Sequence, residues 1–226
     1  QARNDEQAEK EEFHDAMQYA VKILMNSFYG VFASGFYRFT HKDLGSSITA
    51  WARHNIKAII QKLDEEGHHV VYSDTDSIFV RSPVAEGSPS VLREDADQET
   101  IDAYEAAKQA MIDFGLEVAQ RYSKDSAVLE YEKGLSVFFS HGAKKRYVGQ
   151  VVYPTEDMLI RGYETQRTDS FEYLTTAMKQ MFQFALNDER DALIQHALET
   201  VSAVKKHEVP ARRLILAKSC KGRVDS

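Results

Sequence analysis

Two aspartates, Asp74 and Asp76, stand one residue apart between the apolar runs at 70–72 and 78–80. Runs of this kind are typical of strands, and the short polar break predicts a tight hairpin turn that holds both acids at its tip. Two carboxylates about 4 Å apart repel by about 4 kcal/mol at an effective dielectric constant near 20. They must therefore face water, share a proton or bind a cation, and cation binding is our working hypothesis.

A second group of polar side chains lies on a helix predicted over residues 5–28, which has one apolar face and which Gly30 is expected to end. Lys22, Asn26 and Tyr29 follow one another at i, i+4 and i+7, so they share the opposite face. A solvated polar face is the plainer interpretation. A cation, an amide and an aromatic hydroxyl could also serve a ligand that carries phosphate and a base.

A basic cluster, Lys144, Lys145, Arg146 and Tyr147, comes between a glycine turn and a predicted strand. Strand periodicity would place Lys145 and Tyr147 on one face, with Lys144 and Arg146 on the other. Charges on an edge strand also prevent aggregation, which is the alternative explanation. Together with an acidic hairpin and a Lys/Asn/Tyr helix face, contact with a nucleic-acid backbone is the more economical account.

The elements that must position these groups alternate between helical and strand patterns. Ser46 or Ser47 is expected to cap a helix that Gly67 ends, and residues 81–98 are expected to form a loop. Further helices are predicted over 99–122 and 170–206, the latter with a break near 187–188, and strands over 128–131, 135–139, 147–153, 158–160 and 214–216. This pattern predicts an α+β fold, with helices packed on an antiparallel sheet.

Composition sets limits on the function. The 226 residues are 43% hydrophobic and 28% charged, as in an ordinary globular domain, and the formal charge of −7 argues against a broadly basic nucleic-acid binder. The sequence contains no apolar run near the roughly 20 residues of a membrane span, so we expect no contact with a membrane. The polar start argues against a secretory signal, and the single cysteine, Cys220, fits a reducing cytoplasm.

The aspartate pair leaves more than one chemistry open. Sugar-nucleotide transferases use such a pair to hold a metal, and this is the main alternative class of enzyme. A calcium-binding loop is excluded because Phe79 stands where that loop needs glycine, and Ala85 where it needs a bidentate glutamate. The sequence has neither a phosphate-binding P-loop nor the Cys/His spacing of a zinc site.

The motifs together resemble the polymerase module of family B DNA polymerases. Residues 22–30 (KILMNSFYG) are similar to the fingers pattern K-x-x-x-N-S-x-Y-G, and residues 72–77 (YSDTDS) to the palm pattern Y-G-D-T-D-S, with Ser73 in place of glycine. Residues 144–147 (KKRY) match the K-K-x-Y element that grips the duplex. Residues 161–169 (RGYETQRTD) resemble G-x-E-x-x-R-R-D, with Thr168 in place of the second arginine.

The resemblance implies a role for each group. Lys22 would contact the triphosphate of the incoming deoxynucleotide, Asn26 would support that site, and Tyr29 would lie against the nascent base pair. Asp74 and Asp76 would be catalytic ligands of two Mg²⁺ ions. The DNA-binding residues would be those of the basic cluster and the later motif, namely Lys144, Lys145, Arg146, Tyr147 and Arg167.

The resemblance also implies an organisation: a fingers helix over 1–30, a palm domain over 31–168 and the truncated start of a helical thumb over 169–226. The family's further aspartate belongs to an upstream segment, so we expect a fragment of a DNA-directed DNA polymerase with little activity of its own. A non-catalytic nucleic-acid-binding remnant of a polymerase is another alternative. The expected partners are primer–template DNA, deoxynucleoside triphosphates and a sliding clamp, and the location in a prokaryote would be the cytoplasm, at the nucleoid.

Overall fold

The computed structural model describes residues 2–85, 87–124, 127–163 and 170–217. The chain divides into two compact units, an N-terminal unit (Gln1–Arg81) and a C-terminal unit (Ser82–Ser226). This division reflects packing density along the chain. The domain boundaries expected after residues 30 and 168 concern functional subdivisions and stay predictions.

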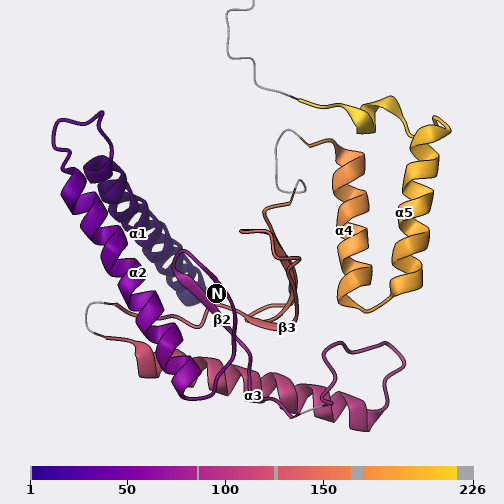
Figure 1. The fold of residues 1–226 in the computed structure, drawn as a ribbon, viewed down its shortest axis with the longest axis horizontal. Coiled ribbons are helices and arrows are strands. Elements are labelled where there is room, and N and C mark those ends of the chain that lie inside the picture. Colours follow the sequence, from indigo (N-terminus) through magenta and orange to yellow (C-terminus); the bar gives the residue numbers. More distant parts are fainter. Residues whose placement is uncertain (1, 86, 125–126, 164–169, 218–226) are drawn as a thin grey trace, which may run out of the picture. The chain divides into compact units, whose positions relative to one another are not determined.

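The N-terminal unit consists of a long helical hairpin followed by a strand hairpin (Figure 1). Its elements are α1 (Ala2–Ala33), α2 (Lys42–Glu65), β1 (Val70–Asp74) and β2 (Ser77–Val80). The predicted first helix is present, but Gly30 does not end it, because the helix continues and the N–H of Ser34 donates to the Gly30 carbonyl at 3.0 Å. Near the loop between the helices the backbones approach closely, since a β-carbon on Gly45 would lie 3.0 Å from that of Ala33.

The start of α2 was predicted wrongly and its end correctly. The helix begins at Lys42, so Ser46 and Ser47 lie inside it and do not cap it. At its end Gly67 takes the left-handed φ of +83°, its N–H donates to Asp64, and the N–H of the next residue donates to Leu63 at 2.8 Å. This pair of hydrogen bonds is a Schellman motif, which satisfies the last helical carbonyls and directs the chain into β1.

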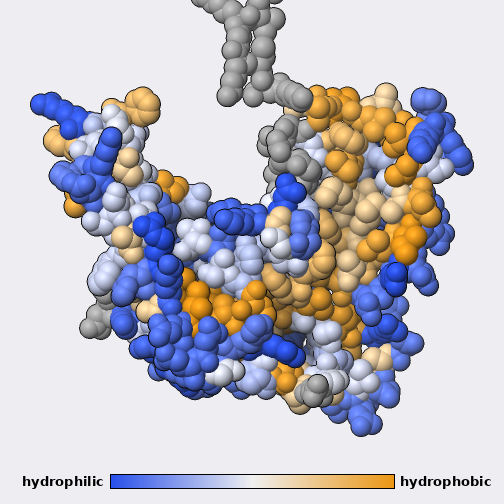
Figure 2. Space-filling view, in the orientation of Figure 1, coloured by the Kyte–Doolittle hydropathy of each residue, from blue (hydrophilic) through white to orange (hydrophobic). Residues whose placement is uncertain are grey.

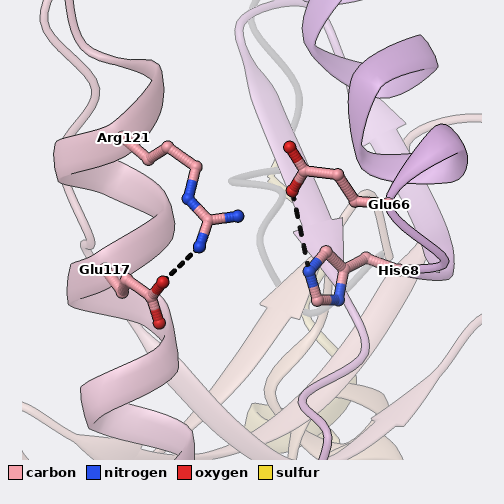
Figure 3. A network of polar contacts seen from close by, with 4 residues as sticks. All are labelled: Glu66, His68, Glu117 and Arg121. Carbon is pink, nitrogen blue, oxygen red and sulfur yellow. Dashed lines mark hydrogen bonds and ion pairs between the residues drawn. The ribbon is translucent and has the colours of Figure 1, made fainter.

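Each unit also carries a short-range ion pair (Figure 3). In the N-terminal unit Nε2 of His68 lies 3.9 Å from a carboxylate oxygen of Glu66. In the C-terminal unit Arg121 pairs with Glu117 one turn earlier on the same helix. Both pairs are local in sequence and partly exposed, so each contributes little to stability.

The first helix of the C-terminal unit is α3 (Gln98–Tyr122), which confirms the helix predicted over 99–122. The side chain of Asp97 caps this helix by accepting the N–H of Thr100 at 2.9 Å. Hydrogen bonds from the side chain and the N–H of Thr100 hold the pKa of Asp97 below its ordinary value. The helix therefore has a defined start at the end of the predicted loop.

A three-stranded antiparallel sheet follows, in the order β3-β4-β5. Its strands, β3 (Gly134–Phe139), β4 (Tyr147–Tyr153) and β5 (Asp157–Arg161), confirm three of the predicted strands. The strand predicted over 128–131 is wrong. The N–H of Leu129 donates to the hydroxyl of Ser123 at 2.8 Å, so this segment closes a loop after α3 instead of joining the sheet.

Two helices and a short 3₁₀ turn complete the unit: α4 (Glu172–Leu186), α5 (Arg190–Lys205) and η2 (Ala211–Leu214). The break between α4 and α5 falls where the sequence predicted it, with Asp188 at a φ of +57°. The strand predicted over 214–216 is wrong. Arg213 donates to Glu172 at 3.0 Å and lies over the ring of Tyr173, and these contacts accompany a 3₁₀ turn beside α4.

The core of the C-terminal unit joins the sheet to α4. Val148, Ile160 and Leu186 are at most 3% exposed, and Tyr163 and Phe182 pack against them. Figure 2 shows hydrophobic residues over α4 and α5. On α5, Ile194, Leu198 and Val201 are each 46–67% exposed. The α+β class is therefore confirmed, with two small antiparallel sheets. Within the described residues, no helix is both long and apolar enough to cross a membrane.

Candidate functional site

Asp74 and Asp76 lie at the tip of the β1–β2 hairpin, as predicted. The last pair of the hairpin is Asp74 with Ser77, so only Thr75 and Asp76 form the turn. The N–H of Asp76 donates to the carbonyl of Asp74 at 2.6 Å, and the hydroxyl of Ser77 donates to the same carbonyl at 3.0 Å. These two hydrogen bonds thus fix the backbone of the turn that carries both acidic residues.

That single residue has an unusual backbone conformation. Thr75 has a φ of +51°, and the hydrogen bond that spans it makes a γ-turn. A β-branched residue in this region costs about 1–3 kcal/mol and persists only where the surrounding structure imposes it. The Thr75 hydroxyl donates to Oδ1 of Asp74 at 3.1 Å, which orients that carboxylate.

The two carboxylates differ in exposure. Asp74 is half-buried and Asp76 is exposed. Behind them the rings of Tyr72 and Phe79 meet edge to face at 5.5 Å, which stiffens the hairpin across its two strands. This cross-strand packing stabilises the part of the hairpin that carries the acidic tip.

Oxygen ligands on a fixed turn suit a hard cation such as Mg²⁺, which is commonly bound through one or two carboxylates. In the described part of the chain no group of three or more His, Cys, Asp or Glu residues could hold a metal. The hairpin therefore fits a divalent ion as a two-carboxylate partial site, which further oxygen ligands would have to complete.

Lys22, Asn26 and Tyr29 share one side of α1, as their spacing requires, and all three are exposed. The opposite, apolar side of the helix is also largely open within the described chain, since Met17 and Phe28 are each 53% exposed. The polar side is thus exposed and available to a ligand.

The basic cluster has a different conformation from the one predicted. Lys144 and Lys145 lie in a turn before β4, so strand alternation does not apply to them. The N–H of Arg146 donates to the carbonyl of Ala143 at 3.2 Å, and Lys145 has a φ of +63°, as at the third position of a type II turn. We call residues Ala143–Arg146 the basic turn.

Exposure separates the members of the cluster. Lys144, Lys145 and Arg146 are exposed, whereas Tyr147 begins β4, is only 8% exposed and packs against Phe138 at 5.8 Å. The three cations are consequently presented by a turn that is anchored by a buried aromatic residue. Arg167, the remaining predicted DNA contact, lies outside the described residues.

One residue that sequence reasoning left without a role contacts the basic turn directly. A β-carbon on Gly162 would overlap the carbonyl oxygen of Lys145 and would lie 2.9 Å from its carbonyl carbon. The signal was available, because Gly162 belongs to the motif at 161–169 and follows a predicted strand. Only the structure shows which backbone it makes room for.

Comparison with a solved structure defines the fold. The structure of the family B DNA polymerase from the hyperthermophilic archaeon Pyrobaculum calidifontis matches this chain with a TM-score of 0.59 and 21% sequence identity. The match covers 93% of this chain and 24% of that polymerase. The fold is therefore that of part of such a polymerase.

Sequence comparisons then identify the family. The family model described as DNA polymerase family B matches residues 1–225, and the chain belongs to this family. A DNA polymerase of Thermococcus gorgonarius is 28% identical over 207 residues, and DNA polymerase II of Escherichia coli is 29% identical over 215 residues. These alignments cover 89% and 90% of this chain but 24% and 26% of the relatives, so the chain spans about a quarter of their length.

Proposed function

We propose that this chain is part of a DNA-directed DNA polymerase, which transfers a nucleotidyl group from a deoxynucleoside triphosphate to a primer 3′-hydroxyl. The observation that carries the proposal is the family match over residues 1–225, together with a hairpin that presents Asp74 and Asp76 at one tip. The C-terminal unit adds an exposed basic turn.

In this proposal Asp74 and Asp76 would hold two divalent ions, most simply Mg²⁺. Such ions, when bound, lower the pKa of the attacking hydroxyl and neutralise the leaving pyrophosphate. The γ-turn at Thr75 keeps both carboxylates at one tip before any ion arrives, which limits the reorganisation that binding requires. Ligands from outside the described residues would complete the site.

The exposed side of α1 serves the incoming nucleotide. Lys22 places a point charge against the triphosphate, Asn26 supports that site by hydrogen bonding, and Tyr29 offers a ring to the nascent base pair. The spacing of these residues on one helix, with side chains exposed, supports this assignment.

The basic turn serves the primer–template duplex. Lys144, Lys145 and Arg146 would neutralise backbone phosphates, which orients DNA without reading its sequence. Tyr147, being buried, would act mainly by anchoring the turn, and Arg167 would add a further cation. The proposal also includes a sliding clamp as partner and, in a prokaryote, a cytoplasmic location at the nucleoid. Both follow only from the proposed polymerase function.

The test is binding of primer–template DNA by the 226-residue chain, followed by fluorescence anisotropy over a range of NaCl concentrations. We expect the logarithm of the association constant to fall linearly with the logarithm of salt, with a slope of about −0.9 for each phosphate contacted. A DNA affinity that does not change with salt concentration, or preferential binding of a sugar nucleotide, would instead support the sugar-nucleotide transferase class. DNA binding without primer extension by any longer form of the protein would support a non-catalytic remnant.

A further inference from the structure

Gly162 lies directly after β5 and has a left-handed φ of +72°. The nearest atoms to a β-carbon built on it all belong to the basic turn: the carbonyl oxygen and carbon of Lys145 and, at 3.0 Å, Cγ of Arg146. Two of these atoms are backbone, so they cannot move aside as the end of a flexible side chain could. The glycine is required here both by its φ and by the space it leaves.

The basic turn is itself held in a conformation that lysine seldom adopts. Lys145 has a φ of +63°, and the turn is closed by the hydrogen bond from Arg146 to Ala143. The hydroxyl of Ser140 also donates to the carbonyl of Arg146 at 3.2 Å. A left-handed lysine between two further cations persists only if its surroundings impose that geometry.

The sheet register explains how Gly162 can impose it. Tyr147 pairs with Arg161 and Val148 with Ile160, so Gly162 continues β5 past the point where the basic turn enters β4. Val148 and Ile160 are 1% and 3% exposed, which makes this end of the ladder part of the core. The position of Gly162 relative to the turn is therefore set by buried packing.

The residue after Gly162 fixes it from the other side. Tyr163 packs against Phe182 of α4, with ring centroids 4.8 Å apart, and its ring meets His141 edge to face at 6.2 Å. His141 belongs to the loop that leads into the basic turn. Gly162 thus lies between the buried Ile160 end of β5 and a partly buried aromatic residue, and the Lys145 carbonyl lies against it.

We infer that Gly162 is a positioning residue that holds Lys145 and the basic turn in the conformation that presents three cations to the DNA backbone. This inference rests on the proposed function for its ligand, the duplex backbone. It assigns to Gly162 an effect on DNA binding although the residue carries no charge and no side chain. A β-carbon would displace the turn, and the cations would no longer meet phosphates together.

The experiment compares four variants of the 226-residue chain: Gly162→Ala, Lys145→Gln, the double variant, and Gly87→Ala. Gly87 is the matched control, because its φ is +86° but a β-carbon there would meet no atom within 4 Å. Each variant's affinity for primer–template DNA is measured by anisotropy against salt. The slope reports the number of phosphate contacts, which a mere loss of folded protein does not change.

Lys145→Gln is expected to make the salt dependence shallower, reducing the magnitude of the slope by about 0.9, the value for one phosphate. Gly162→Ala is expected to reduce it by about 0.9 to 2.7, corresponding to one to three contacts, and the double variant no further than Gly162→Ala alone. Gly87→Ala should keep the wild-type slope. An unchanged slope for Gly162→Ala beside a reduced slope for Lys145→Gln would overturn the inference and leave the proposed function intact.

Hydrogen exchange of the Arg146 amide gives a readout that needs no DNA. We expect faster exchange in Gly162→Ala than in Gly87→Ala, because the bond to Ala143 is lost; equal rates would refute the positioning role even if the wild-type chain did not bind DNA. If Gly162→Ala fails to fold, Lys145→Gly on that background is the second variant. Its freer backbone should restore folding, measured by circular dichroism, and continued failure would count against the contact with residue 145.

Discussion

The ring of Tyr131 occupies the space where a β-carbon on Gly115 would stand. That β-carbon would lie 2.5 Å from Cδ2 and 2.7 Å from Cζ of the ring. The same ring stacks on Tyr153 of β4 with centroids 5.1 Å apart, and its hydroxyl lies equally close to the β-carbon position of Gly134. Tyr131 thus joins α3 to the three-stranded sheet through two glycines.

Gly115→Ala is expected to destabilise the C-terminal unit. Alanine favours a helix by about 1 kcal/mol over glycine, but overpacking a filled site costs about 1–3 kcal/mol, and here the obstacle is a ring held by stacking. The balance predicts a lower free energy of unfolding and a midpoint about 2–4 °C lower per kcal/mol, measured by thermal unfolding. Gly30→Ala in α1 is the control, since no atom lies within 4 Å of its β-carbon. It should raise helix content, and a stabilised Gly115→Ala would contradict the close contact.

Tyr131→Phe is expected to change the dependence of stability on alkaline pH. Burial, and secondarily the neighbouring Tyr153, raises the pKa of Tyr131 to about 12 from an ordinary value of 10.0. Because the pKa is raised, the folded state keeps the Tyr131 proton to a higher pH than the unfolded state does. The stability that this difference contributes is therefore complete below pH 10 and is lost as pH rises from about 10 to 12. Urea unfolding across that range should show a shallower decline for the phenylalanine variant.

At neutral pH the same variant should be as stable as wild type or slightly more so. The Tyr131 hydroxyl is buried without a hydrogen-bond partner among the described residues, and removing such a group relieves about 1–3 kcal/mol of desolvation. Tyr37→Phe, which removes a hydroxyl from an exposed ring, is the control. A loss of several kcal/mol at pH 7 would show that the hydroxyl makes an essential bond.

Lys22→Gln is expected to weaken nucleotide binding specifically. A charge-assisted contact to a triphosphate contributes about 1.5–3 kcal/mol, which corresponds to a rise in KM of roughly 10- to 150-fold in the polymerase that contains this chain. Primer–template affinity should change little, because the substituted residue would face the nucleotide and not the duplex. Lys57→Gln, on the exposed side of α2, removes the same charge elsewhere and should alter neither quantity. Equal effects of the two substitutions would refute the assignment of Lys22.

Local patterns predicted most of the secondary structure. The acidic hairpin, α3, the strand over 147–153 and the break after α4 follow from periodicity, turn residues and capping residues that act within a few positions. The failures involve contacts that a local pattern does not contain. The segment at 128–131 has strand-forming residues, yet Leu129 bonds to a serine hydroxyl and Tyr131 inserts between glycines.

The candidate site divides in the same way. The spacing of Asp74 and Asp76 was sufficient to place them at one tip, because a hairpin brings its turn residues together whatever surrounds it. Strand periodicity was wrongly applied to the basic turn, because its left-handed lysine depends on Gly162, which lies 17 residues further along the chain. The alternation of side chains along one strand carries no information about a residue at the end of another strand.

Asp76→Asn, in the polymerase that contains this chain, is expected to abolish primer extension while leaving DNA binding intact. Changes to residues that only support metal ligands commonly cost 10- to 100-fold, so loss of a direct ligand should exceed about 100-fold. Asp74→Asn should act similarly, although its amide oxygen can still accept the hydrogen bond that Thr75 donates to the carboxylate. Single-turnover extension over a range of Mg²⁺ concentrations, with anisotropy for DNA affinity, separates the two effects.

Asp64→Asn is the matched control for both substitutions, because this exposed aspartate on α2 uses its backbone carbonyl, not its carboxylate, to accept the N–H of Gly67. Its extension rate should equal that of wild type. Removing a negative charge at the hairpin tip should not weaken binding of a polyanion, so weaker binding cannot be invoked to explain lost synthesis in the two tip variants. If Asp76→Asn extended primers at the wild-type rate, the exposed carboxylate at the hairpin tip would not be a metal ligand, and the catalytic role would have to rest on Asp74 alone.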